Sequence, residues 1–167
     1  CIELKQLLLP FFPTLKSLSK IECYDISHFS GSLTVGSMTV LLDGIPEKSL
    51  YRRFKIRSNA KSDVDSLAEM IKRRLKHTDW ELPQLILVDG GKPQVSKIVR
   101  IMAELNFDIS VVGIAKKWEE LVILNANQFI LKRLSRNSTS LRLLQIIRDE
   151  AHRFGLKYHR LLRRKAF

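Results

Sequence analysis

The amino-acid sequence predicts a mixed α/β domain in which helices flank one central sheet. Two observations support this class. Three segments with strand-like alternation follow one another between residues 21 and 57, joined by short connections, which favours an antiparallel meander. From residue 62 onward, segments with helical periodicity alternate with short apolar strands. A chain of 167 residues suits one domain with a substantial core.

The first part of the chain contains a short helix and the three meander strands. Residues 2–9 predict the helix, and a connecting segment follows it as far as residue 20. The first strand is predicted at residues 21–27, with alternate side chains on opposite faces. The second and third strands are predicted at residues 32–44 and 49–57, on either side of the turn DGIPEK.

The rest of the chain alternates helices and strands. The helix predicted at residues 62–75 has apolar residues at spacings of three and four, and Ser62 with Asp65 gives a start similar to a capping box. Pro93 at the opening of the next helix is typical of a first helical turn. In chain order, the further predictions are a strand in LPQLILVDG, a helix at 93–105, a strand at 109–116, a hairpin at 120–134 and a long helix from residue 139.

The charge of the chain points to an anionic partner. Lysine and arginine number 29 against 17 acidic residues, so the formal net charge is +12 and the isoelectric point is about 10.0. The alternative is a uniformly solvated basic surface. The charge is localised, however: Tyr51, Arg53, Lys55 and Arg57 share one strand face, and no acid follows Glu150. Such stripes favour contact with nucleic-acid phosphates, and no base-recognition motif indicates sequence specificity.

The cysteine content and hydropathy exclude several classes of protein. Cys1 and Cys23 show no CxxC spacing and no neighbouring histidine cluster, so neither a disulfide framework nor a zinc site is predicted. A reducing cytoplasm is the expected location. No apolar run is long enough to span a bilayer, so no membrane partner is expected. Because the chain begins at a cysteine, we expect it to be a fragment of a longer protein.

Two aspartates at strand positions are candidates for a metal site. In LILVDGGK, Asp89 follows a fully apolar strand and precedes two glycines, although it could simply cap the helix near Pro93. Asp25 lies on the same strand face as Ile21 and Cys23, where a charge needs a cation or hydrogen bonds. Two such acids on neighbouring strands would suit one Mg²⁺ or Mn²⁺ ion; a salt bridge to Arg or Lys is the alternative.

The last helix adds a candidate histidine. Arg148, His152, Gly155 and His159 recur at spacings of four, three and four, which predicts one common stripe. Glycine is unfavourable inside a helix, so Gly155 suggests that something approaches the helix closely there. The alternative is a structural or solvated histidine. The opposing apolar face is predicted to comprise Leu141, Leu144, Ile147, Ala151, Phe154, Tyr158 and Leu162.

Five segments in order resemble one known family. The segments IECYDISHFSG, YRRFKI, LILVDGGKPQ, VVGIAKK and LLQIIRDEAHRFGLKYHRLLRRK are similar to successive blocks of the C-terminal endonuclease domain of UvrC, the bacterial nucleotide-excision-repair nuclease. The likeness covers about residues 21 to 165. It implies an RNase H-like mixed sheet in a domain at 21–167, preceded by an N-terminal helix and connecting segment at 1–20.

The resemblance also implies an activity, a cofactor and partners. A protein of this family incises damaged double-stranded DNA on the 5′ side of a lesion with Mg²⁺ or Mn²⁺, and works with UvrB after UvrA has acted. The family's catalytic positions fall on Asp25, Asp89 and His152, with the two aspartates as metal ligands. Asp65 (or Asp63) is the candidate for an auxiliary ligand, because Ser66 replaces the second acid of a pair common in the family.

Basic residues near these blocks are the candidates for binding DNA. They are Arg52, Arg53, Lys55, Lys92, Arg148, Arg153, His159, Arg160, Arg163 and Arg164. Pro93 stands where the family usually has glycine, and Gly155 where it commonly has alanine; neither change removes a catalytic atom. Two other functions fit the same sequence. One is an RNase H-like binding module with little or no cutting activity, and the other is an RNA-directed ribonuclease H.

Overall fold

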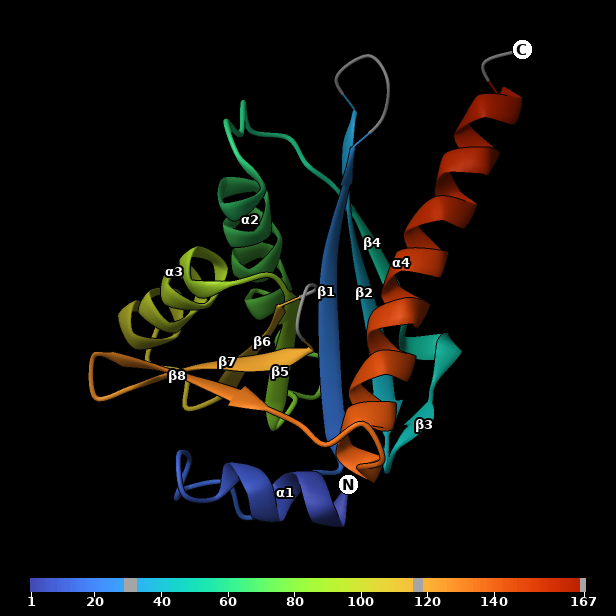
Figure 1. The fold of residues 1–167 in the computed structure, drawn as a ribbon. Helices are drawn as coiled ribbons and strands as arrows, with labels where there is room; N and C mark the ends of the chain where they lie inside the picture. Colours follow the sequence, from blue (N-terminus) through green and yellow to red (C-terminus); the bar gives the residue numbers. More distant parts are fainter. Residues whose placement is uncertain (29–32, 116–118, 166–167) are drawn as a thin grey trace.

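The computed structural model describes residues 1–28, 33–115 and 119–165, without the side chains of His159, Leu162, Arg163 and Lys165. It contains one mixed sheet with the strand order β3-β2-β1-β5-β6-β7-β8, and β4 pairs with β2 beside this path. Helices cover both faces of the sheet (Figure 1). The predicted α/β class is therefore confirmed. No helix in the described part of the chain has the length and apolar character needed to cross a membrane.

The elements follow the predicted order with two local differences, both between β2 and β4. The segment expected to be a strand at 49–57 begins with a 3₁₀ turn, so its strand is shorter. A two-residue strand also occupies the preceding turn. The elements are α1 (Ile2–Leu8), β1 (Lys20–His28), β2 (Thr34–Leu42), β3 (Ile45–Pro46), η1 (Lys48–Leu50), β4 (Arg52–Lys55), α2 (Asp63–Leu75), β5 (Leu85–Asp89), α3 (Lys92–Glu104), β6 (Ser110–Ala115), β7 (Glu120–Asn125), β8 (Gln128–Arg133) and α4 (Thr139–Lys165).

The chain packs in three layers because β1 and β5 bury side chains on both faces. On one face, Ile21 and Cys23 of β1 lie in a core that also contains buried residues of α1 and α4. On the other face, Tyr24 lies in a core with α2 and α3. Since α1 buries Leu4 and Leu8 in the same core as α4, the first helix is part of this packing. The division into residues 1–20 and 21–167 stays a prediction.

The position of α4 corrects the predicted arrangement of its faces. Gly155 lies on the buried face of the helix, after Ile147 and Ala151, and not on an exposed stripe with His152. A Cβ atom at Gly155 would lie 2.8 Å from Ser27 Oγ and 3.0 Å from Ser37 Oγ. The close approach expected at this glycine is therefore that of the protein's own strands β1 and β2.

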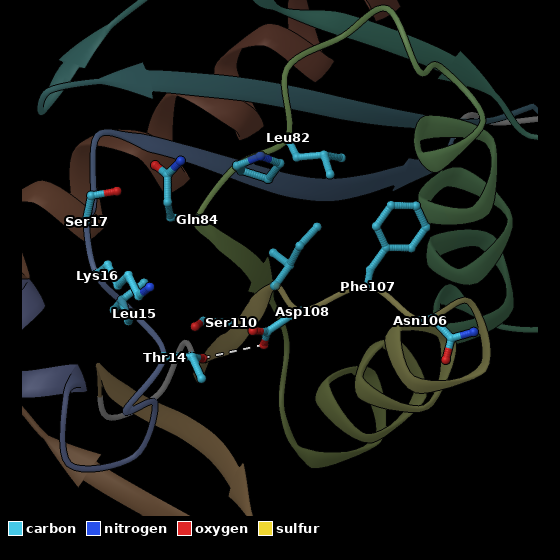
Figure 2. Close-up of a pocket in the computed structure, with 12 residues that line it drawn as sticks. Thr14, Leu15, Lys16, Ser17, Leu82, Gln84, Asn106, Phe107, Asp108 and Ser110 are labelled. Atoms are coloured by element: carbon cyan, nitrogen blue, oxygen red, sulfur yellow. Dashed lines mark hydrogen bonds between the residues drawn. The ribbon is translucent and has the colours of Figure 1, made fainter.

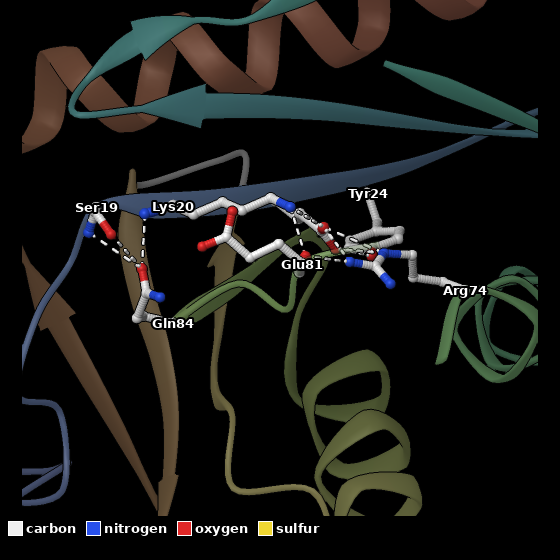
Figure 3. Close-up of polar contacts among 7 residues, drawn as sticks. Ser19, Lys20, Tyr24, Arg74, Glu81 and Gln84 are labelled. Atoms are coloured by element: carbon white, nitrogen blue, oxygen red, sulfur yellow. Dashed lines mark hydrogen bonds and ion pairs between the residues drawn. The ribbon is translucent and has the colours of Figure 1, made fainter. Parts of the chain in front are cut away.

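A buried ion cluster joins β1 to α2 on the face of the sheet that α2 and α3 cover (Figure 3). Arg74 Nη2 lies 2.8 Å from Glu22 Oε1, and both side chains are only 1% exposed. The Nζ atom of Lys20 lies 3.6 Å from the same carboxylate, and the Tyr24 hydroxyl donates to it at 2.5 Å. The carbonyl of Glu81 accepts hydrogen bonds from both cations. One carboxylate thus holds two buried cations.

We expect the Glu22→Gln substitution to lower the free energy of unfolding by about 3–5 kcal/mol, because it leaves the cations of Lys20 and Arg74 without their carboxylate. Urea unfolding of both proteins measures this difference. Glu104→Gln, at an exposed position at the end of α3, is the matched control and should change the free energy by less than about 0.5 kcal/mol. Equal effects of the two substitutions would show that the ion cluster does not stabilise the fold.

Candidate active site

The parallel pairing of β1 with β5 brings the two candidate aspartates together. Cys23 pairs with Leu87 and Tyr24 with Val88, so Asp25 and Asp89 are the next residues on the two neighbouring strands. Alternation places both carboxylates on the face that α4 covers, together with Cys23 and Leu87. Neighbouring strands lie about 4.8 Å apart, so the two side chains start from adjacent points on a rigid sheet.

The electrostatics of Cys23 locate a third charged group at this position. Burial raises the pKa of the Cys23 thiol well above its usual range, the carboxylates of Asp25 and Asp89 raise it further, and Arg148 opposes them. The thiol therefore lies within the field of both acids and of the Arg148 guanidinium. Asp25 is 7% exposed, and Asp89 is half-buried. Two carboxylates in so little water attract a cation strongly.

His152 of α4 completes the arrangement. Its Nδ1 atom lies 3.6 Å from Asp25 Oδ2. The imidazole is 59% exposed, whereas the Asp25 side chain is 8% exposed. The histidine therefore covers the solvent side of the acid and remains accessible to a substrate. The structure thus brings together the three residues that the sequence analysis singled out.

The turn after β5 is shaped by Gln94 and does not use Asp89 as a helix cap. Gly91 is the N-cap residue of α3, and Gln94 Oε1 accepts a hydrogen bond from its backbone amide at 3.1 Å. A Cβ atom at Gly90 would lie 2.7 Å from Gln94 Cγ, so a larger residue there would require the Gln94 side chain to move. Lys92 begins α3 with an exposed side chain next to Asp89. The alternative role of Asp89 as N-cap is therefore wrong.

The auxiliary ligand expected from the sequence is not close to the two strand acids. Asp65 lies in the first turn of α2, on the opposite face of the sheet from α4, where its carboxylate accepts a hydrogen bond from Ser62 at 3.0 Å. Asp63 forms an ion pair with His28. Within the described part of the chain, no group of three or more His, Cys, Asp or Glu side chains could hold a metal ion. Two carboxylates would fit a hard cation that takes its other oxygen ligands from water and a phosphate.

Several of the predicted DNA-binding residues are exposed near this site or along α4. Lys92 lies beside the β5 turn, and its Nζ atom is 5.6 Å from the centroid of the Phe129 ring. Arg153 is exposed and forms an ion pair with Glu150 at 2.8 Å. Lys55, Arg160 and Arg164 are also exposed. The predictions for His159 and Arg163 concern side chains outside the described part of the chain.

Two of the arginines predicted to bind DNA, Arg52 and Arg53, lie on opposite faces of the sheet. Arg52 donates hydrogen bonds to the carbonyls of Ser49 and Tyr51, and its guanidinium lies 4.9 Å from the centroid of the Trp80 ring. Arg53 points toward α4, where it stacks on Phe154. Arg52 therefore does not share the strand face predicted for Arg53 and Lys55, because adjacent strand residues face opposite ways. Arg148 is only 19% exposed and lies 3.4 Å from Asp149.

A separate groove of about 430 Å³ lies near the opposite ends of the parallel strands (Figure 2). The connecting segment at Thr14 and Lys16 forms one wall, and the turns at Gln84 and Asp108 form the other. Thr14 Oγ1 donates a weak hydrogen bond to Asp108 across the groove. None of the predicted site residues lines it. The carboxylate arrangement, and not the size of this groove, identifies the candidate active site.

The chain is similar to known proteins over most of its length. Residues 12–156 match the family model of the UvrC RNase H endonuclease domain. The UvrABC system protein C of Syntrophomonas wolfei subsp. wolfei is 42% identical over 153 residues, covering 88% of this chain and 25% of that protein. The same protein of Bdellovibrio bacteriovorus is 44% identical over 161 residues, covering 86% and 25%. The chain thus spans about a quarter of the length of these relatives.

Among solved structures, the chain is similar to Ciona intestinalis endonuclease V in complex with a 24mer DNA containing an inosine followed by a ribo-adenosine. The TM-score is 0.48 with 17% sequence identity, and the match covers 68% of this chain and 54% of the other.

We expect Asp25→Asn and Asp89→Asn each to weaken Mn²⁺ binding at least tenfold, because each removes one of the two adjacent negative charges, and tenfold is about 1.4 kcal/mol of binding free energy. Isothermal titration of Mn²⁺ into each folded variant measures this. Asp65→Asn is the matched control and should bind Mn²⁺ as the unmodified chain does. If Asp65→Asn weakens binding as strongly as the other two, the site includes α2 and our assignment of the ligands is wrong.

Proposed function

The chain belongs to the family of UvrC RNase H endonuclease domains, and we propose that it is a metal-dependent DNA endonuclease of nucleotide excision repair. The observation that carries this proposal is the meeting of Asp25 and Asp89 on adjacent parallel strands with His152 above them. The mixed sheet with helices on both faces agrees with the RNase H-like fold of this family.

Asp25 and Asp89 are the proposed ligands of a divalent cation, Mg²⁺ or Mn²⁺. Their rigid positions on β1 and β5 fit a hard ion that prefers carboxylate oxygens. When bound, such an ion polarises the scissile phosphate and helps to generate hydroxide near neutral pH. The chain's own contribution is to hold the two carboxylates adjacent while α4 excludes water from their inner side.

His152 is the proposed proton-transfer group. Its imidazole is exposed on the substrate side of Asp25, so it can contact either an attacking water molecule or the leaving oxygen. The Nδ1 atom faces Asp25, which leaves Nε2 for the reacting group. Arg148, on the preceding turn of α4, supplies positive charge next to the site.

The relatives support a proposal for the substrate and the partners. We propose damaged double-stranded DNA as the substrate, incision on the 5′ side of the lesion, action after UvrA with UvrB in the cytoplasm, and contact between the DNA backbone and the exposed cations of α4. The UvrABC system proteins that the chain matches support this proposal. The net charge of +12 also supports a polyanionic substrate.

A nicking assay with Mn²⁺ on duplex DNA, damaged duplex DNA and an RNA–DNA hybrid tests the proposed function. We expect cutting of DNA, with preference for the damaged duplex, and no cutting by Asp25→Asn under the same conditions. Cutting confined to the RNA strand of the hybrid would indicate a ribonuclease H. DNA binding without any cutting, even together with the partner proteins, would indicate a binding module.

We expect His152→Ala to bind DNA and Mn²⁺ nearly as the unmodified chain does, yet to cut about 10²–10⁴-fold more slowly, because it lacks the proton-transfer group. Single-turnover rates measured over a series of Mn²⁺ concentrations provide the test. If additional Mn²⁺ restores the rate, His152 is a metal ligand instead. An unchanged rate per folded molecule would exclude His152 from the chemistry.

A further inference from the structure

We propose that Tyr51, which directly precedes β4, and Arg53 of β4 are positioning residues that fix the rotation of α4 about its own axis, and thereby hold His152 over Asp25. The inference rests on the proposed function of His152. It gives the segment YRRF a structural role inside the protein, whereas the sequence predicts that its arginines contact DNA.

Tyr51 anchors α4 through Glu150 and Phe154. The tyrosine hydroxyl donates a hydrogen bond to Glu150 Oε2 at 2.9 Å. The same carboxylate accepts two hydrogen bonds from Arg153, each 2.9 Å long, which fixes its orientation. The Tyr51 ring also packs edge-to-face against Phe154, with 5.3 Å between centroids and 71° between planes. This single side chain therefore holds two successive turns of the helix.

Arg53 anchors the helix one turn further along. Its guanidinium carbon lies 3.9 Å from the centroid of Phe154 and 4.9 Å from that of Tyr158. Its Nε atom is buried, and this burial lowers the pKa of the guanidinium. A cation that stacks on two aromatic rings and has lost part of its hydration is engaged inside the protein. It is not placed as an extended side chain that reaches for a phosphate.

The arrangement of α4 connects this anchor with the site. Glu150, Phe154 and Tyr158 recur at four-residue spacing and form the β4 flank of α4. The buried stripe of Ile147, Ala151 and Gly155 lies next to it on the sheet. Arg148 and His152 lie on the other side of that stripe, on the flank of α4 that faces Asp25. Contacts on one flank therefore determine where the other flank lies.

A small rotation of α4 would move His152 away from Asp25 by a distance that matters for catalysis. Side-chain atoms lie about 5–6 Å from a helix axis, so a rotation of roughly 20° displaces them by roughly 2 Å. The separation of His152 Nδ1 from Asp25 Oδ2 is 3.6 Å. A misplacement of about 1 Å can reduce a catalysed rate about 10²-fold. The contacts of Tyr51 and Arg53 on the β4 flank therefore act together with the packing of the buried stripe to fix this rotation.

Kinetic double-mutant cycles test the proposal. Arg53→Gln, Arg53→Lys and Tyr51→Phe are each made in the unmodified chain and in His152→Ala. We expect Arg53→Gln to lower kcat for nicking about 10–10²-fold with KM nearly unchanged, and to cause no further loss in the His152→Ala background. Arg53→Lys should be similarly impaired, because lysine keeps the charge but not the planar stacking. Tyr51→Phe, which keeps the ring and loses only the hydrogen bond to Glu150, should show a smaller loss.

Lys55→Gln is the matched control, since Lys55 lies on the same strand face as Arg53 with an exposed side chain. We expect this control to raise KM, to flatten the slope of log affinity against log salt by about one, and to add to the effect of His152→Ala. Arg53→Gln should leave that slope unchanged. If Arg53→Gln instead behaves as Lys55→Gln does, or if Arg53→Lys restores the rate, Arg53 contacts a phosphate and the proposal is wrong.

A crystal structure of Arg53→Gln separates this inference from the proposed function. We expect α4 to be rotated and the distance from His152 Nδ1 to Asp25 Oδ2 to exceed 3.6 Å. An unchanged distance overturns the positioning role even if the chain cuts DNA. An increased distance supports the role even if no nuclease activity is found. Melting temperatures identify any variant that fails to fold; if Arg53→Gln is such a variant, Tyr51→Phe, which keeps its packing, takes its place.

Discussion

The parallel pairing of β1 with β5 is the constraint on which the rest of the structure depends. It places Asp25 beside Asp89, and it also buries the side chains of both strands on both faces, so the helices must cover the sheet from two sides. A parallel pair needs a crossover connection. Here β2, β4 and α2 provide the chain between β1 and β5, so the meander and the first long helix are also part of the route that makes the acid pair possible.

The two faces of β1 each carry a carboxylate, Glu22 on one face and Asp25 on the other, and the two carboxylates have different surroundings. On the α2 face, Glu22 is compensated internally by Arg74 and Lys20, which ties the strand to a helix more than 50 residues away in sequence. On the α4 face, Asp25 is bordered by Asp89 and by a histidine that is itself largely exposed. The first carboxylate stabilises packing. The second lies on the same strand, next to Asp89, as a candidate ligand of the proposed cation.

The sequence predicted the elements and indicated the three candidate site residues because these depend on local patterns. Alternation defined β1, a continuous apolar run defined β5, and helical spacing defined α2 and α4. Acids at or directly after apolar strand positions indicated Asp25 and Asp89. Long-range partners were not predictable in this way. Alternation separates Arg53 from Arg52, but nothing in the local sequence shows that Arg53 stacks on α4 or that Gly155 faces Ser27 and Ser37. Gly155 follows His152 by three positions, and only the packing of α4 on the sheet decides which of the two faces the strands.

The net charge of the chain overstates how many cations remain available to a polyanion. Arg74 is buried against Glu22, and Arg53 is stacked on aromatic rings. Arg73 forms an ion pair with Glu69 and also donates a hydrogen bond to the Lys55 carbonyl. These arginines serve the fold, where a planar guanidinium can stack and form several hydrogen bonds at once. Other cations remain exposed, among them Lys92 near the β5 turn and Arg160 and Arg164 on α4. Under the proposed function, a DNA backbone that contacts Arg160 and Arg164 would also pass the acid pair, because α4 carries His152 beside Asp25 and continues toward these arginines.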